Sequence, residues 1–503
     1  MEVLIRRSGT LIDVGPTDGS PLPEPVFYAL KPHLQYQYRK HIRGQAAYSQ
    51  STGRREYVAS ELRNMFRIEQ NRLVTGYGFI PRVVSVLRQH GHDVVIHDIS
   101  PPPERPNRFE EDWDAVRRYT EFRPRQEECL RAIAAAVSCN GGGVVAASTG
   151  FGKTRGLVCL ALLYPRAKIH IVCKPKDVVQ KIANELVGAM PNTGQVGGGR
   201  RDEGKRVTVF TADSLHHSDG DCDILLAEEA HQLMAPRYSQ ALGRLYRYSL
   251  NFAFTATPEG RFDGADAMME MFFGPRIFDL PYDEAAALGL VVPIHVRWLP
   301  VRMDYNPVAG YDTATAKKRW GFWRNEPRNA IFAEAARAYP PDHQVLMMVE
   351  TVEHAVHLWQ HLPEFALCYG AADADAIERY KRIGMLPEGY EPMTARTREA
   401  MRHAFETMQL HKVIATDVWS TGVSFDALQT LFRLDGRDGD ILSTQIPGRT
   451  SRIYEGKQYG EIYDSTDEFD KAFHARALKR RRRYKKLGWS QDWPQAGQLE
   501  VVP

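Results

Sequence analysis

Short apolar runs that alternate with helical stretches dominate the chain from residue 140 onward. In the first half of this region, apolar and β-branched residues concentrate at 141–147, 168–173, 206–212, 223–229 and 250–257. After the turn at 272–275 the pattern restarts, with runs at 294–301, 344–349, 366–369, 412–416 and 428–434. Runs of this kind are typical of strands covered on both faces, and their alternation with helices favours parallel sheets. The pattern therefore predicts an α/β fold with two parallel-sheet domains in tandem.

A stiff, polar, proline-rich segment at 100–106 indicates a linker between an N-terminal domain and these two domains. We therefore predict a small α/β N-terminal domain at 1–112 and a first parallel-sheet domain at 113–290. A second parallel-sheet domain is predicted at 291–465, followed by a basic C-terminal tail at 466–503.

The composition narrows the class of protein. The chain has 503 residues, which is too long for one ordinary core, and a net charge of +3, so any strongly basic surface must be local. The six cysteines are scattered without a Cys-x-x-Cys pair, so we expect neither a zinc site nor a disulfide framework. Without a signal peptide or an apolar run of membrane-spanning length, we expect a cytoplasmic protein that does not bind a membrane.

A phosphate-binding loop is predicted at 147–154, where an apolar strand runs into Gly-Lys-Thr. Gly150 and Gly152 let the backbone curl so that successive N–H groups point at an anion, while Lys153 supplies a positive charge. The Thr154 hydroxyl can join a magnesium shell, and the helix that follows adds its positive N-terminal end. Ala147 stands where the usual template has glycine. An ordinary flexible turn is the alternative, and nucleotide binding is the stronger hypothesis.

Two adjacent carboxylates, Glu228 and Glu229, follow the apolar run at 223–227. The carboxyl ends of parallel strands face the ligand crevice, so we assign Glu228 to the metal and Glu229 to the base that deprotonates the attacking water. The alternative is an acidic strand end paired by surface cations. His231 is predicted to couple this strand end to its neighbour at 255–257.

Arg449 and Arg452, three positions apart, lie on one face if the segment is helical. A guanidinium suits a γ-phosphate, and an arginine supplied to a nucleotide from another domain raises the rate by about 10³ to 10⁵. A surface salt bridge is the alternative for such a pair taken alone.

Taken in order, these motifs resemble those of superfamily-two DExH-type helicases over about residues 119–465. Residues 123–126 resemble the adenine-reading glutamine segment, 228–231 the Asp-Glu-x-His box, and 255–257 the coupling triplet. The resemblance implies two RecA-like motor domains, ATP hydrolysis with Mg²⁺, and catalytic roles for Lys153, Glu229, Arg449 and Arg452. It implies nucleotide contacts by Arg123, Gln126, Ser148, Thr149, Gly150, Phe151, Gly152, Lys153, Thr154, Gly422 and Asp426. Glu228 departs from the family box, which has Asp there, and we expect a metal contact through water to absorb the longer arm.

Within the superfamily, residues 257–264 and the compact second lobe resemble the branch of phage UvsW-type branched-DNA helicases and XPB-like translocases. Residues 69–82, with the helix to Arg88 and the strand at 93–97, resemble the small substrate-binding domain of the phage enzymes. The resemblance implies a monomeric ATP-dependent DNA helicase or translocase that remodels forks, junctions and R-loops in recombination, repair or replication. It would work in the host cytoplasm if a phage encodes it.

Other segments point to nucleic-acid contact. Basic and aromatic residues interleave in the N-terminal domain, which suits phosphates and exposed bases or an ordinary charged surface over a core. The resemblance places Lys174, Thr211, Ser214 and Thr416 on the nucleic-acid track, and the basic run with Arg480, Arg481, Arg482 and Arg483 is predicted to contact phosphates. Residues 317–324 either grip DNA or pack their aromatic rings inward.

Three other functions stay open: an RNA helicase, a restriction-type DNA translocase subunit, and a nucleotide-gated DNA-binding scaffold without turnover. The scaffold would be favoured by missing catalytic groups, and Lys153, Thr154 and Glu229 are all present.

Overall fold

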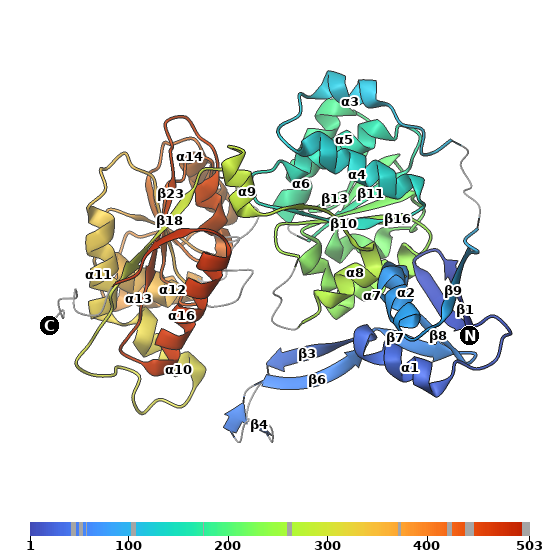
Figure 1. Ribbon diagram of the computed structural model, residues 1–503. Coiled ribbons are helices and arrows are strands. Elements are labelled where there is room, and N and C mark those ends of the chain that lie inside the picture. Colours follow the sequence, from blue (N-terminus) through green and yellow to red (C-terminus); the bar gives the residue numbers. More distant parts are fainter. Residues whose placement is uncertain are drawn as a thin grey trace. The chain divides into compact units, whose positions relative to one another are not determined.

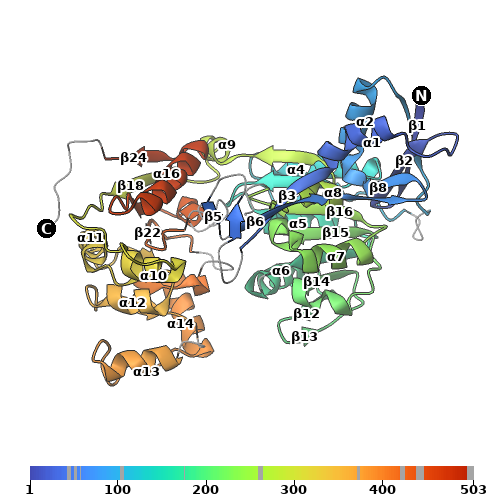
Figure 2. The ribbon, with the colours of Figure 1, turned by 90° about the horizontal axis from the view of Figure 1, so that it is seen from below.

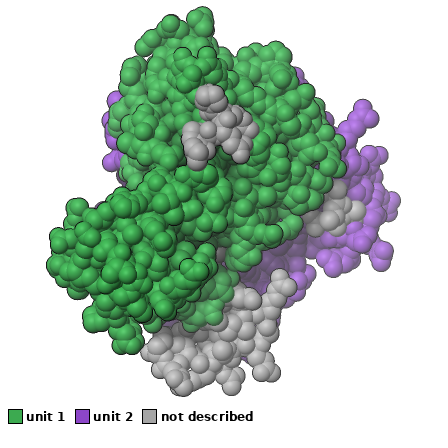
Figure 3. All heavy atoms as spheres, turned by 90° about the vertical axis from the view of Figure 1, so that its right-hand side faces the viewer, with its two compact units in different colours: residues 1–148, 152–280 green, residues 149–151, 281–503 purple. Residues whose placement is uncertain are grey.

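The computed structural model describes residues 1–41, 47–49, 54–56, 58–101, 107–174, 176–258, 264–370, 374–419, 425–437 and 447–494. Contacts divide the chain into two compact units (Figure 3). The first unit holds residues 1–148 and 152–280, and the second holds residues 149–151 and 281–503. No helix within the described ranges is long and apolar enough to span a membrane.

A five-stranded mixed sheet in the order β7-β8-β2-β1-β9 forms the N-terminal part of the first unit. Alternate residues of β1, such as Val3 and Ile5, are buried beneath α1 and α2, as the twofold period of a strand requires. The predicted strand and helix near residue 90 are confirmed by β9 and α2. The elements are β1 Glu2–Ser8, β2 Leu11–Pro16, α1 Glu24–Leu30, β7 Phe66–Glu69, β8 Arg72–Gly76, α2 Ile80–Gln89 and β9 Asp93–Asp98.

Strands β3 (Gln35–His41) and β6 (Val58–Asn64) form a separate antiparallel ribbon that extends from this sheet (Figure 1). The short strands β4 (Ala47–Ser49) and β5 (Arg54–Glu56) pair with each other between them. The side chains of the basic and aromatic residues at 40–59 lie outside the described part of the chain.

The N-terminal sheet packs closely on the α/β domain that follows it. The Tyr77 hydroxyl donates a hydrogen bond to the Phe273 carbonyl at 2.6 Å. A Cβ atom at Gly78 would lie 1.7 Å from the Glu270 carbonyl oxygen, so only glycine allows this approach. The two parts therefore form one unit. The domain boundary at 112 stays a prediction, and most of the predicted linker, 102–106, lies outside the described residues.

The first parallel sheet has eight strands in the order β13-β12-β14-β11-β15-β16-β10-β17. All the predicted strands of this domain are confirmed to within two residues. Among the described strands of this sheet, only β13 runs antiparallel to its neighbour. The strands are β10 Gly143–Ala147, β11 Ile169–Cys173, β12 Thr193–Gly197, β13 Arg200–Arg201, β14 Val207–Thr211, β15 Ile224–Glu228, β16 Leu250–Thr255 and β17 Arg276–Leu280.

Helices cover both faces of this sheet. In Figure 1, α4 and α5 lie on one face, and α7 and α8 lie on the other. This coverage explains why the strands read as continuous apolar runs. The helices are α3 Trp113–Tyr119, α4 Gln126–Ser138, α5 Lys153–Leu163, α6 Lys176–Ala189, α7 Pro236–Leu245 and α8 Ala267–Phe273.

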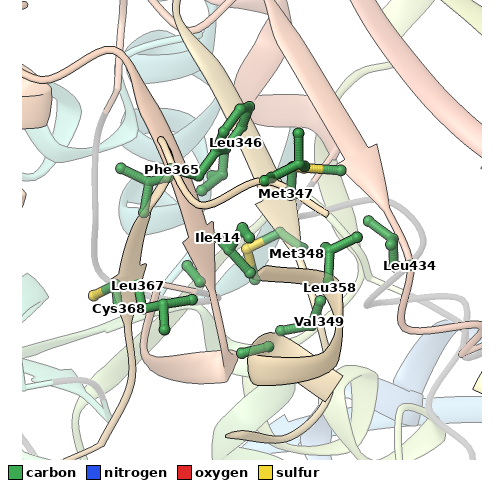
Figure 4. Close-up of a cluster of buried hydrophobic side chains, with 14 of the residues drawn as sticks. Leu346, Met347, Met348, Val349, Leu358, Phe365, Leu367, Cys368, Ile414 and Leu434 are labelled. Carbon is green, nitrogen blue, oxygen red and sulfur yellow. The ribbon is translucent and has the colours of Figure 1, made fainter. Parts of the chain in front are cut away.

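The second unit contains a parallel sheet of seven strands in the order β20-β21-β19-β22-β23-β18-β24. In Figure 2, α16 lies on one side of it, and α11 and α12 lie on the other. Leu346 and Met348 of β19 belong to one buried cluster with Ile414 of the adjoining strand β21 and Leu367 of β20 (Figure 4). The strands are β18 Ile294–Leu299, β19 Val345–Met348, β20 Ala366–Cys368, β21 Lys412–Ala415, β22 Thr430–Arg433, β23 Gly460–Ser465 and β24 Ser490–Asp492. The helices are α9 Tyr282–Ala287, α10 Ala314–Lys318, α11 Glu326–Arg337, α12 Val352–Trp359, α13 Ala374–Arg382, α14 Ala395–Glu406 and α16 Lys471–Lys486.

The structure corrects the prediction for the basic segment at 466–494 and decides between the two alternatives for the segment at 317–324. The predicted basic tail is wrong for the described residues 466–494, because α16 packs on the second sheet and β24 pairs with β18. Phe473, Ala477 and Tyr484 of α16 are buried. The segment at 317–324 turns Phe322 and Trp323 inward, as the packing alternative requires, and leaves Trp320 partly exposed.

Candidate functional site

The predicted phosphate loop connects the carboxyl end of β10 to the start of α5. Gly150 and Gly152 adopt φ angles of 94° and 93°, the left-handed region that favours glycine. The Lys153 ammonium donates a hydrogen bond to the Ala147 carbonyl at 3.1 Å, so the lysine folds back over its own loop. Thr154 occupies the first turn of α5, whose N-terminus attracts anions.

Gln126 lies against this loop. Its Oε1 accepts a hydrogen bond from the Arg123 backbone N–H at 3.0 Å, which closes a turn at the start of α4. A Cβ atom at Gly152 would lie 2.7 Å from the Gln126 side-chain nitrogen. The structure thus brings the predicted adenine-reading segment and the predicted phosphate loop together.

Glu228 ends β15 and is only 5% exposed. Burial raises the pKa of its carboxyl to about 8, and the neighbouring Glu229 adds to the rise, while the charges of Lys153 and Lys181 oppose it. Its Oε2 atom is buried and has no hydrogen-bond partner among the described residues. A buried carboxylate oxygen that lacks a donor suits a cation, so Glu228 with Thr154 fits the predicted magnesium site.

Glu229 and His231 connect two neighbouring strand ends. Glu229 has a φ of 51°, an unusual backbone for a residue other than glycine, and follows directly on β15. The Nδ1 atom of His231 lies 3.0 Å from Oγ1 of Thr255, the last residue of β16, and 3.4 Å from Oε2 of Glu229. The predicted contact between His231 and 255–257 is therefore present.

Ser148, directly after β10, is buried, and its hydroxyl has no hydrogen-bond partner among the described residues. Thr149 and Phe151 complete the loop, and the Phe151 side chain is buried. Because β10 and β15 flank β16 in the sheet, the carboxyl ends of three adjacent strands carry the predicted site residues of this domain.

The two arginines of the second unit are held by different partners. Arg449 lies in a 3₁₀ helix, Pro447–Ser451, and its Nη1 donates to the Trp419 carbonyl at 2.9 Å. Arg452 follows this helix and forms an ion pair with Asp426 at 2.7 Å. Gly422 lies outside the described residues.

The predicted nucleic-acid residues are in different environments. Thr211 and Thr416 are buried, and their contact with nucleic acid stays a prediction. The Thr211 hydroxyl donates to Ser214 at 2.7 Å. Lys174 is exposed, with its ammonium 5.8 Å from the centre of the Tyr238 ring.

Arg480 does not contact phosphates in the way that the basic run predicts. It is 1% exposed and makes a two-pronged ion pair with Asp464, because position 480 of α16 faces the sheet. Arg481 and Arg482 on the same helix are exposed, and Arg483 is partly exposed.

Sequence analysis missed Lys457, which is buried beside Asp426. No local pattern marks it, because its acceptors are backbone carbonyls rather than side chains.

Known proteins resemble this chain in sequence over residues 119–260 and in fold over most of its length. Residues 119–260 match the family described as "Type III restriction enzyme, res subunit". No curated protein sequence matches the chain. Among solved structures, Dbp5 of S. cerevisiae bound to RNA and ADP BeF3 has a TM-score of 0.51 at 12% identity, over 77% of this chain and 93% of that one. UvsW of T4 has a TM-score of 0.39 at 15% identity, over 98% of this chain and 99% of that one.

The resemblance to superfamily-two helicases is thereby confirmed, and the fold is that of two RecA-like parallel-sheet domains preceded by a small α/β region.

Proposed function

We propose that this protein is an ATP-dependent DNA helicase or translocase that remodels branched DNA. The observation that carries the proposal is the carboxyl edge of the first sheet. There, the phosphate loop, the Glu228–Glu229 pair and the His231–Thr255 contact come from the three adjacent strands β10, β15 and β16. A nucleotide-gated scaffold that does not hydrolyse ATP would not need a catalytic base such as Glu229 beside the phosphate loop.

In the proposed mechanism, the loop N–H groups and Lys153 bind the phosphates of ATP. Thr154 and Glu228 would hold Mg²⁺, which when bound neutralises charge on the phosphates. Glu229 orients the attacking water and accepts its proton. His231, which contacts both Glu229 and Thr255, passes the state of the nucleotide to the next strand end.

We assign Arg449 and Arg452 the role of arginine fingers that stabilise charge on the transferred phosphoryl group. Such a residue is worth about 10³ to 10⁵ in rate. Asp426 and Gly422 are proposed to contact the nucleotide from the same domain. Hydrolysis would then depend on the second unit meeting the nucleotide during the cycle.

The ribbon of β3 and β6 supports contact with duplex DNA. Residues 35–64 contain six lysines or arginines and two glutamates, so the segment is strongly basic in a nearly neutral chain. A two-stranded β-ribbon has the width to enter the major groove of B-form DNA. Leu62 is 69% exposed on this ribbon, and Arg63 stacks on Tyr38 at 3.4 Å from the ring centre.

The outer face of α16 supports binding to phosphates. Arg482 and Lys486, one helical turn apart, are exposed, and α16 contains no acidic residue. Contacts of this kind are independent of sequence and weaken steeply with salt. Lys174 and Ser214 are proposed to contact nucleic acid from the first unit.

The decisive experiment compares stimulation of the ATPase by single-stranded DNA, duplex DNA, four-way junctions and RNA at matched salt. We expect the largest stimulation with branched DNA. Preferential stimulation by RNA would replace the proposal with an RNA helicase, and no stimulation by any of them would overturn the motor function.

A restriction-type DNA translocase subunit is the second candidate, because the family matched at 119–260 is described as the res subunit of a type III restriction enzyme. Such a subunit would be stimulated equally by linear duplex and by four-way junctions. The same ATPase comparison therefore separates the two candidates.

A further inference from the structure

Three cationic side chains from residues 449–457 bind two short segments of the second unit. Arg449 donates to the Trp419 carbonyl, and Arg452 pairs with the Asp426 carboxylate. Lys457 makes the third connection: its ammonium donates to the Leu428 carbonyl at 2.7 Å and to the Asp426 carbonyl at 3.1 Å. The segment at 425–428 is thus held by a side chain at 452 and by another at 457.

Burial of the Lys457 ammonium costs free energy. The residue is only 9% exposed, and its ammonium donates to two main-chain carbonyls rather than to a carboxylate. Burial lowers the pKa of its ammonium to about 7, with the Asp426 charge opposing that change and the Arg452 charge adding to it. An apolar residue would avoid this cost, but it would leave the Leu428 carbonyl without the ammonium that binds it.

The orientation of Arg452 depends on this segment. Asp426 binds the Nη1 atom of Arg452, whose Nε is buried and has no hydrogen-bond partner among the described residues. The Asp426 side chain is itself 60% exposed, so little besides its own backbone restrains it. Lys457 binds that backbone. Phe425 and Leu428, both buried, anchor the two ends of the segment.

We propose that Lys457 is a positioning residue that fixes the backbone of Asp426 and Leu428 and thereby presents Arg452 in one orientation for ATP hydrolysis. Lys457 does not touch the nucleotide. It acts through Asp426 on the guanidinium, so it should affect turnover and leave ATP binding intact. The inference rests on the proposed role of Arg452 as an arginine finger.

The test uses the whole 503-residue chain and three single variants. Lys457→Met keeps the length of the side chain and removes the donor, Lys457→Arg keeps a cationic donor, and Lys471→Met changes an exposed lysine at the start of α16 as a matched control. We expect Lys457→Met to lower kcat about tenfold with the Kd for ATP changed less than about twofold, and Lys457→Arg to recover most of the loss. Lys471→Met should leave both constants unchanged.

A double variant separates positioning from a general loss of structure. If Lys457 acts through Arg452, adding Lys457→Met to Arg452→Ala should lower kcat no further than Arg452→Ala alone. Multiplied losses, or a Kd for ATP that rises as much as kcat falls, would overturn the positioning role. Should Lys457→Met fail to fold, Lys457→Gln takes its place, and an unchanged kcat in that variant would equally overturn it.

The same measurements distinguish this inference from the proposed function. If Arg452→Ala turns over ATP at the rate of the unmodified protein, the arginine-finger assignment fails. If Arg452→Ala is slow and Lys457→Met is not, only the role of Lys457 fails.

Discussion

His231 and Thr255 join the carboxyl ends of two neighbouring strands, β15 and β16, through a contact of 3.0 Å between Nδ1 and Oγ1. Thr255 Oγ1 also accepts a hydrogen bond from the Thr257 N–H at 3.1 Å, and the tautomer of His231 decides whether Nδ1 or Oγ1 is the donor between them. Nδ1 also lies 3.4 Å from Oε2 of Glu229. The imidazole therefore lies between the proposed base and the end of β16.

Thr255→Val should weaken the coupling between ATP hydrolysis and work on DNA. The substitution keeps the shape of the buried side chain and removes the hydroxyl, at a cost of about 1 kcal/mol in stability. We expect DNA-stimulated ATPase to persist while the number of base pairs unwound per ATP falls. Ser239→Ala, which removes another buried hydroxyl of the same domain, is the control. Equal unwinding per ATP in Thr255→Val and the unmodified protein would contradict the coupling role.

Lys153→Ala and Glu229→Gln should fail at different steps. Without its ammonium, Lys153→Ala should bind ATP poorly and show no ATP-dependent work. Glu229→Gln keeps the shape of the base and cannot accept a proton, so we expect normal ATP binding and kcat lowered about 10² to 10⁴-fold. Equilibrium binding of a fluorescent ATP analogue and single-turnover hydrolysis separate the two. Turnover by Glu229→Gln at the normal rate would move the base elsewhere.

Glu228 should make stability depend on pH. Its pKa is raised by burial to about 8, whereas an unfolded chain ionises near its usual value, so the folded state holds a proton that the unfolded state releases between these limits. The free energy of unfolding should therefore fall as pH rises from about 5 to 8, by at most about 1.4 kcal/mol per pH unit for one proton. Urea unfolding of Glu228→Gln and the unmodified protein at several pH values tests this. Parallel profiles would show that Glu228 is already ionised.

The ionisation of Glu228 should also control the affinity for Mg²⁺. A carboxylate must lose its proton to bind Mg²⁺, so we expect Mg²⁺ affinity to increase as pH rises towards 8 and binding to release protons. Calorimetry in buffers of different ionisation enthalpy measures that release. Glu228→Asp, which restores the residue of the family box, should keep Mg²⁺ binding but shift its pH dependence.

Neighbouring arginines of α16 should give opposite phenotypes. Arg480→Ala leaves Asp464 buried without its partner, which costs about 3 to 5 kcal/mol and should lower Tm strongly. Arg482→Ala removes an exposed charge, so Tm should be unchanged and the salt dependence of DNA binding should drop by about one counterion. Thermal unfolding and binding at several salt concentrations check both. An unaltered salt dependence in Arg482→Ala would exclude α16 from the DNA surface.

Much of the fold and of the candidate ATP site could be predicted because the responsible signals are local. The ten predicted strands agree with the structure to within two residues, since each is a continuous apolar run, whereas β12, β13, β17, β23 and β24 were not predicted. The phosphate loop and the Glu228–Glu229 pair could be placed at the same edge because the carboxyl ends of parallel strands meet there.

Charged residues of one run illustrate the limit of that reasoning. Arg480 and Arg482 are alike in sequence, and only the packing of α16 against Asp464 separates a buried ion pair from an exposed cation. The role of Lys457 could not be predicted from the sequence for a similar reason, because its partners are carbonyls 29 and 31 positions away.

The sequence by itself determined the order of the strands along the chain, the glycine-dependent loop and the carboxylates at a strand end, because each depends on neighbours within a few positions. The tertiary structure alone decided that the N-terminal sheet joins the first parallel-sheet domain, through contacts such as that of Tyr77 with Phe273, 196 positions away. It also decided that His231 reaches Thr255 and that Lys457 binds beside Asp426. These contacts join groups that lie far apart along the chain, and whether a polar group is buried depends on which distant partner the fold brings to it.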